Sequence, residues 1–402
     1  MKVVGIITEY NPFHNGHKYH IQKAKEITNS DFCICVMSGT FTQQGNISLI
    51  DKFKKAKIAC QNGCDLVIEL PTIYASSSAE NFALGAVNIL DKLNVVNTIC
   101  FGSETANIQS LTKISDIILK NEDKIWNITK EKLNEGKNFT DARYEALSTF
   151  LDEDMMNEIS TSNNILGLEY INAKKRLNSN IEFTSIKRNS SNFLDTTLST
   201  NTPFTSSTSI REYLKNNKIS NIKDLENYLP NDSYTLLSNS KITLNDDLYQ
   251  ILKYKIINST TEDLAKIYEV NEGLEYKIKN ELNNSNDYDE FVNNIKSRRY
   301  KLSKIKRMLN NILIDLTKND SKNAISKNIA YAHVLACSKN GKKLLSQIAK
   351  NSSIPVFTKL NDTILNSLDS DIKNVLSYDI KASDLHSILL NSKIKKDYTN
   401  HL

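Results

Sequence analysis

The chain has 402 residues, of which 40% are hydrophobic and 24% are charged, a composition typical of a soluble globular protein. Its net charge of +5 permits an anionic partner without requiring one. No apolar run approaches the roughly 18 residues of a membrane span, and the apolar start is too short for a signal peptide. We therefore expect a cytoplasmic protein without membrane contact, large enough for two domains.

The first part of the chain has the pattern of an α/β fold. Nine of the eleven glycines precede residue 168, and short apolar runs alternate there with helical periodicity. This alternation is typical of βαβ units and a Rossmann-like parallel sheet. The expected strands are 3–8, 32–37, 66–70, 97–101 and 181–186.

Three helices are expected between these strands, over residues 17–28, 50–61 and 78–91. The last begins with the capping-box spacing Ser77-x-x-Glu80. Sheets of this kind bind ligands at the carboxyl ends of their strands. The stretch EYNPFHNGHKYH, residues 9–20, follows the first strand and therefore lies at the expected ligand edge.

Within this stretch, His14-Asn15-Gly16-His17 forms an HxGH motif between a strand and a helix. Gly16 lets the backbone approach a phosphate, and the helix start offers free N–H groups. His14 and His17 can donate hydrogen bonds to phosphate oxygens and stabilise charge that develops on phosphorus. Pro12 fixes the turn that leads the chain off the strand.

Two other interpretations of these histidines remain open. They can simply satisfy the free groups of a helix end, or His14, His17 and His20 can bind zinc. Their spacing of three residues drifts around a helix axis, and no nearby carboxylate or thiolate completes a zinc site. The six cysteines form no zinc-ribbon or redox pattern and read as small buried residues. We therefore expect no zinc.

A second motif, SSTxxR, lies far along the chain, with Ser207, Thr208 and Arg211 as its functional candidates. Hydroxyl and backbone N–H groups at a helix start can hold the outer phosphates, and Arg211 adds a fixed charge one turn later. Ser209-x-x-Glu212 also fits a capping box, so a well-capped helix is the alternative. Together with HxGH, the phosphate interpretation is favoured.

From about residue 215 the chain becomes helical, rich in Lys and Asn, and nearly free of glycine. We expect a catalytic domain over residues 1–218 and a helical tRNA-binding domain over 219–402. The run SRRYKLSKIKRM carries Arg298, Arg299 and Lys301 beside Tyr300, without an acidic residue. Leu302, Ile305 and Leu309 predict an apolar helix stripe, which leaves the basic face for RNA or for solvent.

Three more charged residues are candidates for a functional role. Lys52 belongs to a basic cluster at the start of the second expected helix and is a candidate for tRNA contact. Glu69 and Glu104 end their strands at the ligand edge. They can position Mg²⁺ or a ribose, or they can only cap the next segment.

These motifs make the chain resemble the bacterial tRNA(Met) cytidine acetate ligase family of the HIGH-type nucleotidyltransferase superfamily. The resemblance implies a ligase that uses ATP, with Mg²⁺, to convert acetate into acetyl-adenylate and pyrophosphate. The acetyl group then passes to the wobble cytidine of elongator tRNA(Met), giving N4-acetylcytidine and AMP. The matching runs are VVGIITEYNPFHNGHKYH, VMSGTF, DLVIELP, CFGSE, NNILGLEY, SSTSIRE, SRRYKLSKIKRM and DIKAS.

The resemblance also assigns residues. It implies His14, His17 and Arg211 as catalytic. One loop departs from the family pattern: QQGNI stands where relatives usually read QRGEP, so a charged role for Gln44 and Asn46 is in doubt. The implied ATP site comprises Ile7, Thr8, Glu9, Tyr10, Asn11, Pro12, Phe13, His14, Gly16, His17, His20, Gly102, Asn163, Asn164, Arg188, Ser207 and Thr208.

Two other functions compete with this one. A small-molecule adenylyl- or cytidylyltransferase would use the same motifs, but such enzymes are usually short single domains. A non-catalytic RNA-binding protein could retain the fold, although the intact HxGH and SSTxxR motifs argue against it.

Overall fold

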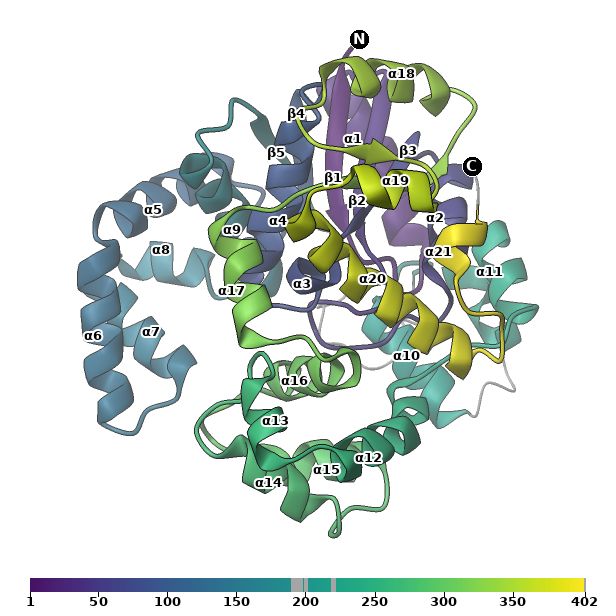
Figure 1. The fold of residues 1–402 in the computed structure, drawn as a ribbon. Coiled ribbons are helices and arrows are strands. Elements are labelled where there is room, and N and C mark those ends of the chain that lie inside the picture. The colour runs from purple at the N-terminus through teal and green to yellow at the C-terminus, as the bar shows by residue number, and fades with distance from the viewer. Residues whose placement is uncertain (189–197, 199–201, 218–221, 401–402) are drawn as a thin grey trace.

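The structure is a computed structural model that describes residues 1–188, 198, 202–217 and 222–400. Its centre is a seven-stranded sheet of order β5-β4-β1-β2-β3-β6-β7 (Figure 1). The strands are β1 (Val3–Thr8), β2 (Phe32–Ser38), β3 (Leu66–Leu70), β4 (Thr98–Ser103), β5 (Glu182–Lys187), β6 (Ala332–Cys337) and β7 (Val356–Phe357).

The five strands expected from the sequence are confirmed, and all five run parallel. The last two strands were not expected. β6 pairs antiparallel with β3, and β7 pairs parallel with β6. The C-terminal half is therefore not purely helical, because it completes one side of the sheet.

Helices surround the sheet, and those expected at 17–28, 50–61 and 78–91 are confirmed as α1, α2 and α4. The helix α4 begins one residue later than its capping box predicted, because the Ser78 hydroxyl accepts the N–H of Asn81 (3.3 Å). The first helices are α1 (Asn15–Thr28), α2 (Lys52–Gln61), α3 (Thr72–Ala75), α4 (Ala79–Lys92), α5 (Ile108–Lys120), α6 (Glu122–Asn134), α7 (Phe139–Ser148), α8 (Glu153–Glu158), α9 (Ser162–Arg176) and α10 (Ser207–Asn216).

Beyond α10 the chain continues through two 3₁₀ helices and further α-helices. None of the helices in the described ranges is long and apolar enough to cross a membrane. They are η1 (Ile222–Tyr228), α11 (Asn231–Ser238), η2 (Asn245–Leu248), α12 (Tyr249–Asn258), α13 (Thr261–Lys266), α14 (Leu274–Glu281), α15 (Tyr288–Ile295), α16 (Leu302–Ile314), α17 (Lys318–Ser326), α18 (Gly341–Asn351), α19 (Asp362–Ser367), α20 (Ser370–Leu389) and α21 (Lys396–Thr399).

The sheet is covered on both faces because successive strand residues point to opposite sides. In β2, Ile34 and Val36 join a core with α4, α9 and α18, whereas Cys33, Cys35 and Met37 join a core with α1, α2 and α10. This arrangement confirms the expected α/β class with a Rossmann-like sheet.

Two helical parts flank the sheet (Figure 1). Helices α5–α8, inserted between β4 and β5, form an arm on the left of the view, and helices α12–α16 lie below. The lower helices share a core with α17 and α20, and this core also includes residues beside the sheet such as Phe41 and Ile73. The expected boundary near residue 218 falls inside a common core, which includes Ile210 and Leu214 on one side of it and Leu225 and Leu229 on the other.

Candidate active site

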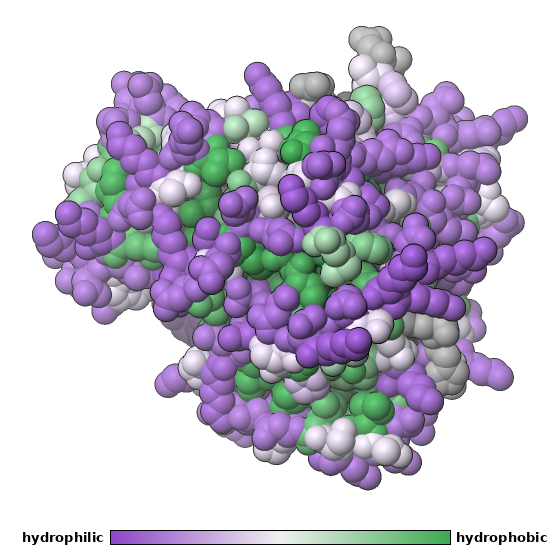
Figure 2. Space-filling model, turned by 90° about the horizontal axis from the view of Figure 1, so that it is seen from above, coloured by the Kyte–Doolittle hydropathy of each residue, from purple (hydrophilic) through white to green (hydrophobic). Residues whose placement is uncertain are grey.

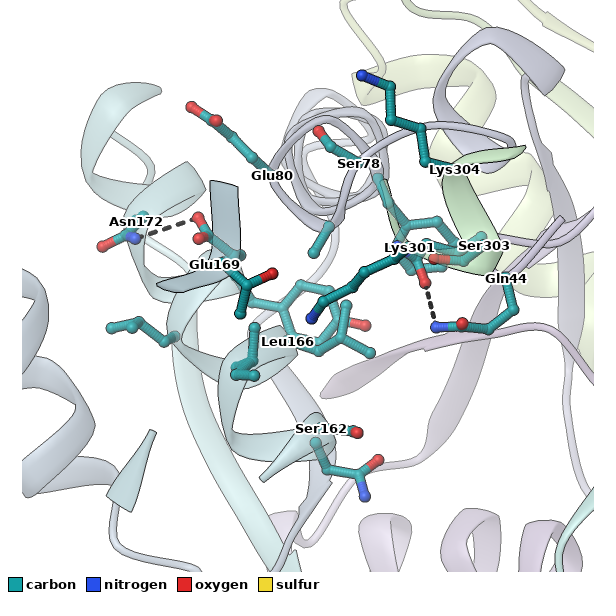
Figure 3. Close-up of a pocket in the computed structure, with 18 of the residues that line it drawn as sticks. Gln44, Ser78, Glu80, Ser162, Leu166, Glu169, Asn172, Lys301, Ser303 and Lys304 are labelled. Carbon is teal, nitrogen blue, oxygen red and sulfur yellow. Dashed lines mark hydrogen bonds between the residues drawn. The ribbon is translucent and has the colours of Figure 1, made fainter. Parts of the chain in front are cut away.

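A cleft of about 1890 Å³ opens at the carboxyl ends of β1, β4 and β5. One wall comes from the HxGH loop, the end of β4 and helix α9, and the opposite wall comes from the segment that leads into α16. Figure 3 shows Leu166 and Glu169 on one side of the cavity, with Gln44, Lys301 and Ser303 on the other. The predicted ligand edge of the sheet is thus a cleft between two parts of the molecule.

The two histidines of the HxGH motif cap helix α1. The Nδ1 atom of His14 accepts the N–H of Gly16 (3.1 Å), and the Nδ1 atom of His17 accepts the N–H of His14 (3.2 Å). Because an accepting nitrogen carries no proton, each neutral ring holds its proton on Nε2. The rings stack with their centroids 3.7 Å apart. The motif therefore provides two Nε2–H donors side by side.

These rings are neutral at pH 7. Burial lowers the pKa of His14 to about 3, and the charges of Arg188 and Arg211 add to this effect. Burial and the neighbouring His14 hold the pKa of His17 well below its ordinary value. Burial and Arg188 likewise lower the pKa of His20 to about 4. A neutral imidazole with an Nε2 proton can donate to an anion without first taking up a proton.

Gly16 is needed because the His14 ring folds back over it. A Cβ atom at this position would lie 3.0 Å from Cε1 and 3.1 Å from Nδ1 of His14. Any side chain would therefore displace the ring that caps the helix. This contact gives the glycine of HxGH a packing role in addition to the open approach that the sequence suggested.

The loop before the motif is held by its neighbours. Tyr10 has a φ of 47°, an uncommon conformation for a bulky residue. The Asn11 side chain donates to the carbonyl of Ile47 and accepts the N–H of Leu49, both at 2.9 Å. Arg211 donates to the Asn11 carbonyl at 2.6 Å. These bonds fix the turn that presents His14 and His17.

The SSTxxR motif lies beside this loop, as predicted. Ser206 caps α10 by accepting the N–H of Ser209 (2.9 Å), so the alternative cap at Ser209 is not the one formed. The Ser207 hydroxyl donates to the Pro12 carbonyl (3.2 Å), and Thr208 Oγ1 accepts from Arg211 (3.1 Å). Ser206 provides the helix cap, while Ser207 lies beside the HxGH loop, so the two interpretations of this helix start are compatible.

A second group of polar residues ends β4 and β5. Arg188 donates to Asn163 Oδ1 (3.3 Å), and Asn163 donates to Glu104 (2.6 Å), whose other oxygen accepts from Thr161 (2.8 Å). Asn164 is fully buried, and its side chain bonds Ser103 (2.6 Å). Asn163 is therefore the member of the pair that faces the cleft, and Glu104 braces the start of α9.

The structure brings most of the predicted ATP-binding residues into one cleft. Pro12, Phe13, Asn164 and Thr208 do not line it and instead support its walls. Those that line it are Ile7, Thr8, Glu9, Tyr10, Asn11, His14, Gly16, His17, His20, Gly102, Asn163, Arg188 and Ser207, together with Arg211.

The expectation that Lys52 contacts tRNA is wrong. Its side chain is only 1% exposed, and its ammonium forms ion pairs with Glu69 (2.7 Å) and Asp397 (2.5 Å). Glu69 also accepts from His333 Nδ1 (2.8 Å) and does not line the cleft, which removes it as a candidate for Mg²⁺ or ribose. These residues instead connect α2 with β3, β6 and α21.

Sequence reasoning did not single out Lys55. Its ammonium donates to the carbonyls of Glu9 (3.0 Å), Ser38 (2.9 Å) and Gly39 (3.0 Å), and so ties together the ends of β1 and β2. Burial lowers the pKa of Lys55 to about 7. The available signal was its position beside Ala56 on the apolar face of α2, where a solvated lysine is not expected.

Helix α16 begins at Leu302, the first residue of the predicted apolar stripe. Arg298 and Arg299 precede it, and Arg299 pairs with Glu272. Arg299 and Lys301 line the cleft, whereas Arg298 is exposed outside it.

The divergent QQGNI loop packs on α16. Arg307 is buried against Glu269 (2.8 Å) and donates to the Gln43 carbonyl (3.2 Å). Asn310 donates to the carbonyl of Gly45 (3.1 Å), and Ile47 is buried. The loop therefore connects the sheet to the lower helices.

The geometry does not favour zinc at the HxGH motif, because both Nδ1 atoms already accept backbone N–H groups. In the described part of the chain, two groups of three residues have ligand atoms close enough for a metal: Cys33, Cys35 and Cys64, and Glu69, His333 and Asp397. Neither group includes a histidine of the motif, and both carboxylates of the second form ion pairs with the ammonium of Lys52.

Comparisons with known proteins agree with this geometry. The HIGH Nucleotidyl Transferase family model matches residues 1–401. A tRNA(Met) cytidine acetate ligase of Clostridium botulinum (strain Langeland) is 39% identical over 99% of this chain and 97% of its own length. The corresponding protein of Clostridium perfringens is also 39% identical, over 99% and 98%.

Two solved structures share the fold. Thermotoga maritima TmcAL, in its apo form, superposes with a TM-score of 0.93 at 30% identity, over 100% of this chain and 99% of its own. The same protein bound with alpha-thio ATP gives a TM-score of 0.91 at 30% identity, with the same coverage. The chain therefore belongs to the HIGH nucleotidyl transferase family and, within it, to the tRNA(Met) cytidine acetate ligases.

Proposed function

We propose that this ligase activates acetate with ATP and transfers the acetyl group to the wobble cytidine of elongator tRNA(Met). The observation that carries the proposal is the pair of neutral Nε2–H donors of His14 and His17, set at a helix start beside Arg188 and Arg211. This arrangement suits a triphosphate at the carboxyl end of β1. The relative solved with alpha-thio ATP supports ATP as the nucleotide.

In the first step an oxygen of acetate attacks the α-phosphorus of ATP, and the bond to the bridging oxygen of the β-phosphate breaks. Acetyl-adenylate forms and pyrophosphate leaves. His14 and His17 donate to phosphate oxygens as negative charge builds, and Arg211 holds the outer phosphates. Because these donors are fixed by the backbone, they need no rearrangement when the charge develops.

In the second step the exocyclic amine of cytidine attacks the acetyl carbonyl carbon. The new C–N bond gives N4-acetylcytidine, the C–O bond to the phosphate breaks, and AMP leaves with the electron pair. The amine loses one proton to solvent. The relatives named for tRNA(Met) support the choice of acceptor.

The division of labour also belongs to this proposal. Residues 1–218 bind ATP and acetate, and residues 219–402 bring tRNA to the cleft, where Arg299 and Lys301 form part of the lining. Mg²⁺ enters with ATP. Neither Glu69 nor Glu104 lines the cleft, whereas Glu9 does, and it accepts the Gln43 N–H (2.6 Å).

Incubation of the protein with radiolabelled acetate, ATP and tRNA tests the proposal. We expect acetate-dependent release of pyrophosphate and AMP, and N4-acetylcytidine in the tRNA after nuclease digestion. ATP turnover at a rate that does not depend on acetate would favour a small-molecule adenylyltransferase. Binding of tRNA without any ATP turnover would instead favour a non-catalytic RNA-binding protein.

A further inference from the structure

The helical arm presents aromatic side chains to the same cleft. Trp126 of α6 is 47% exposed, and Phe139 and Tyr144 of α7 are 46% and 55% exposed. All three line the cleft together with the HxGH loop. Large aromatic side chains are normally buried, so three exposed ones on neighbouring helices indicate a binding surface.

The residues repeat at helical spacing. Along α6 the lining of the cleft includes Glu122, Trp126, Lys130 and Leu133, and along α7 it includes residues 139, 143, 144 and 147. Positions three or four apart lie on one face of a helix. One face of each helix is therefore turned to the cleft. In Figure 2 hydrophobic patches lie among hydrophilic residues on the left, the side on which Figure 1 places this arm.

The charge of the cleft indicates the chemical class of its partner. Its lining contains twelve Lys and Arg residues and seven Asp and Glu residues, an excess that favours a polyanion. Lys130 places its ammonium 5.2 Å from the centre of the Trp126 ring. An aromatic ring next to a cation is the combination that binds single-stranded RNA, where bases stack on rings and phosphates meet cations.

We propose that α6 and α7 form a stacking platform, with Trp126, Phe139 and Tyr144 holding unpaired bases of the RNA loop whose cytidine is modified. This inference rests on the proposed function and extends it. A cytidine whose amine reacts must leave the stack of its neighbours. The platform holds flanking bases, and the basic segment at Lys301 approaches the RNA from the opposite wall.

Trp126 is the only tryptophan of the chain, so intrinsic fluorescence reports on this position alone. Titration of the full chain with a tRNA(Met) transcript should quench the fluorescence, because a stacked base quenches an indole. A fully paired RNA duplex of equal length should leave the fluorescence nearly unchanged. Equal quenching by both RNAs would overturn the proposal.

Affinity measurements provide the second arm. Trp126→Ala and Tyr144→Ala should each raise the Kd for the transcript about tenfold, within the range that stacking on one aromatic residue provides. Trp126→Phe should restore most of the affinity, and ATP affinity should not change. Tyr254→Ala is the matched control, since Tyr254 is 71% exposed outside the cleft.

Unchanged tRNA affinity in folded Trp126→Ala and Tyr144→Ala variants would overturn the platform. A shift from dimer to monomer in these variants, without loss of RNA affinity, would show instead that the face binds a second copy of the chain. Failure of the proposed function is distinct from both results, because the wild-type protein would then bind RNA without acetylating it.

Discussion

The histidines of HxGH derive their chemistry from the backbone that surrounds them. Each Nδ1 accepts an N–H group of the same turn, so the tautomer is set before a nucleotide arrives. Burial keeps both rings neutral. Preorganised donors of this kind stabilise a transition state more than a ground state, because they are aimed where charge develops.

His17→Ala should lower kcat for acetate-dependent pyrophosphate release about 100-fold, which corresponds to a loss of ~3 kcal/mol of transition-state stabilisation. The affinity for tRNA should change little, because the substitution leaves the basic segment and the arm intact. Gln22→Ala, an exposed site on the same helix, is the matched control. A comparable loss in the control would show that α1 itself had been disturbed.

The pH dependence of stability follows from the lowered histidine pKa values. These are about 3 for His14 and about 4 for His20, compared with an ordinary value of 6.5. Between about pH 4 and 6.5 the unfolded chain binds protons that the folded chain does not. The free energy of unfolding should therefore rise with pH in this window and fall toward pH 4. Urea unfolding at pH 5 and 6.5 measures it, and His20→Gln should show a smaller difference than the wild type.

The same lowered pKa values predict how the reaction rate depends on pH. Acetate-dependent pyrophosphate release should show no histidine inflection between pH 5 and 6.5, because His14 and His17 remain neutral throughout. The ratio kcat/KM for ATP, followed from pH 5 to 8, checks this. An inflection near pH 6.5 that disappears in His14→Asn would contradict the neutral-donor assignment.

At the level of helices and strands, the sequence predicted what local periodicity encodes. The five parallel strands and α1, α2 and α4 are each marked by an apolar run or a helical stripe. β6 was missed because AHVLAC is a short apolar run, which strand and buried helix share, inside a stretch that looks helical. Its place beside β3 depends on pairing between residues about 270 positions apart along the chain, such as Leu66 with Cys337, and no local pattern encodes it.

The candidate site shows the same contrast between local patterns, which could be predicted, and long-range contacts, which could not. HxGH and SSTxxR could be predicted, because each motif carries its own chemistry, whereas Arg188 was implied only by the resemblance to the family. The burial of Lys52 could not, since its partners Glu69 and Asp397 come from β3 and α21. The position of the arm beside the cleft also escaped prediction, because α6 and α7 show ordinary helix patterns and only the fold turns them toward the cleft.

The contact of the QQGNI loop with α16 depends on Gly45. This residue has a φ of 76°, and a Cβ there would lie 2.5 Å from Lys306 Cβ and 2.7 Å from the Arg307 nitrogen. Gly136 has a φ of 90° with no atom within 4 Å of such a Cβ. Substitution at Gly136 therefore measures backbone strain alone, whereas substitution at Gly45 measures backbone strain together with a steric clash.

Gly136→Ala should cost about 1 to 2 kcal/mol, the strain of an L-residue in this region. Gly45→Ala should cost clearly more and should also weaken tRNA binding, because the loop would move away from α16. Urea unfolding and tRNA affinity measure the two effects. Equal destabilisation by both substitutions would show that the loop is not tightly packed on the helix.

Across the whole molecule, buried charges connect the two ends of the chain. Lys52 of α2 pairs with Glu69 of β3 and with Asp397 of α21. Although burial opposes its ionisation, the Lys52 charge and the His333 hydrogen bond lower the pKa of Glu69 to about 2. Removing one partner leaves the others buried without compensation, which costs more than the pair contributes.

Lys52→Ala should therefore lower the free energy of unfolding by about 3 to 5 kcal/mol. Lys54→Ala is the matched control, because Lys54 is exposed and its ammonium bonds only Ser240 (3.1 Å) among the described residues. Urea unfolding at pH 7 compares the two. A stable Lys52→Ala variant with weakened tRNA binding would restore the original expectation that Lys52 contacts RNA.

The cleft joins the nucleotide site to the basic segment that leads into α16, and this predicts separable effects on the two ligands. A variant with Arg298, Arg299 and Lys301 all replaced by alanine should bind tRNA more weakly, since the segment neutralises phosphates without reading bases.

Each lost phosphate contact should flatten the plot of log affinity against log salt by roughly one unit. Arg299 should contribute less than Lys301, because Arg299 is already paired with Glu272. ATP affinity should remain, since the donors at the HxGH loop belong to the other wall.

The matched control replaces three exposed lysines around the start of α18, Lys339, Lys342 and Lys343, which lie outside the cleft. It removes the same net charge, so a general loss of attraction would appear in both variants. Affinities for tRNA at several salt concentrations distinguish them. Equal slopes in the two variants would show that the segment before α16 is only a solvated surface and that RNA enters the cleft along the arm alone.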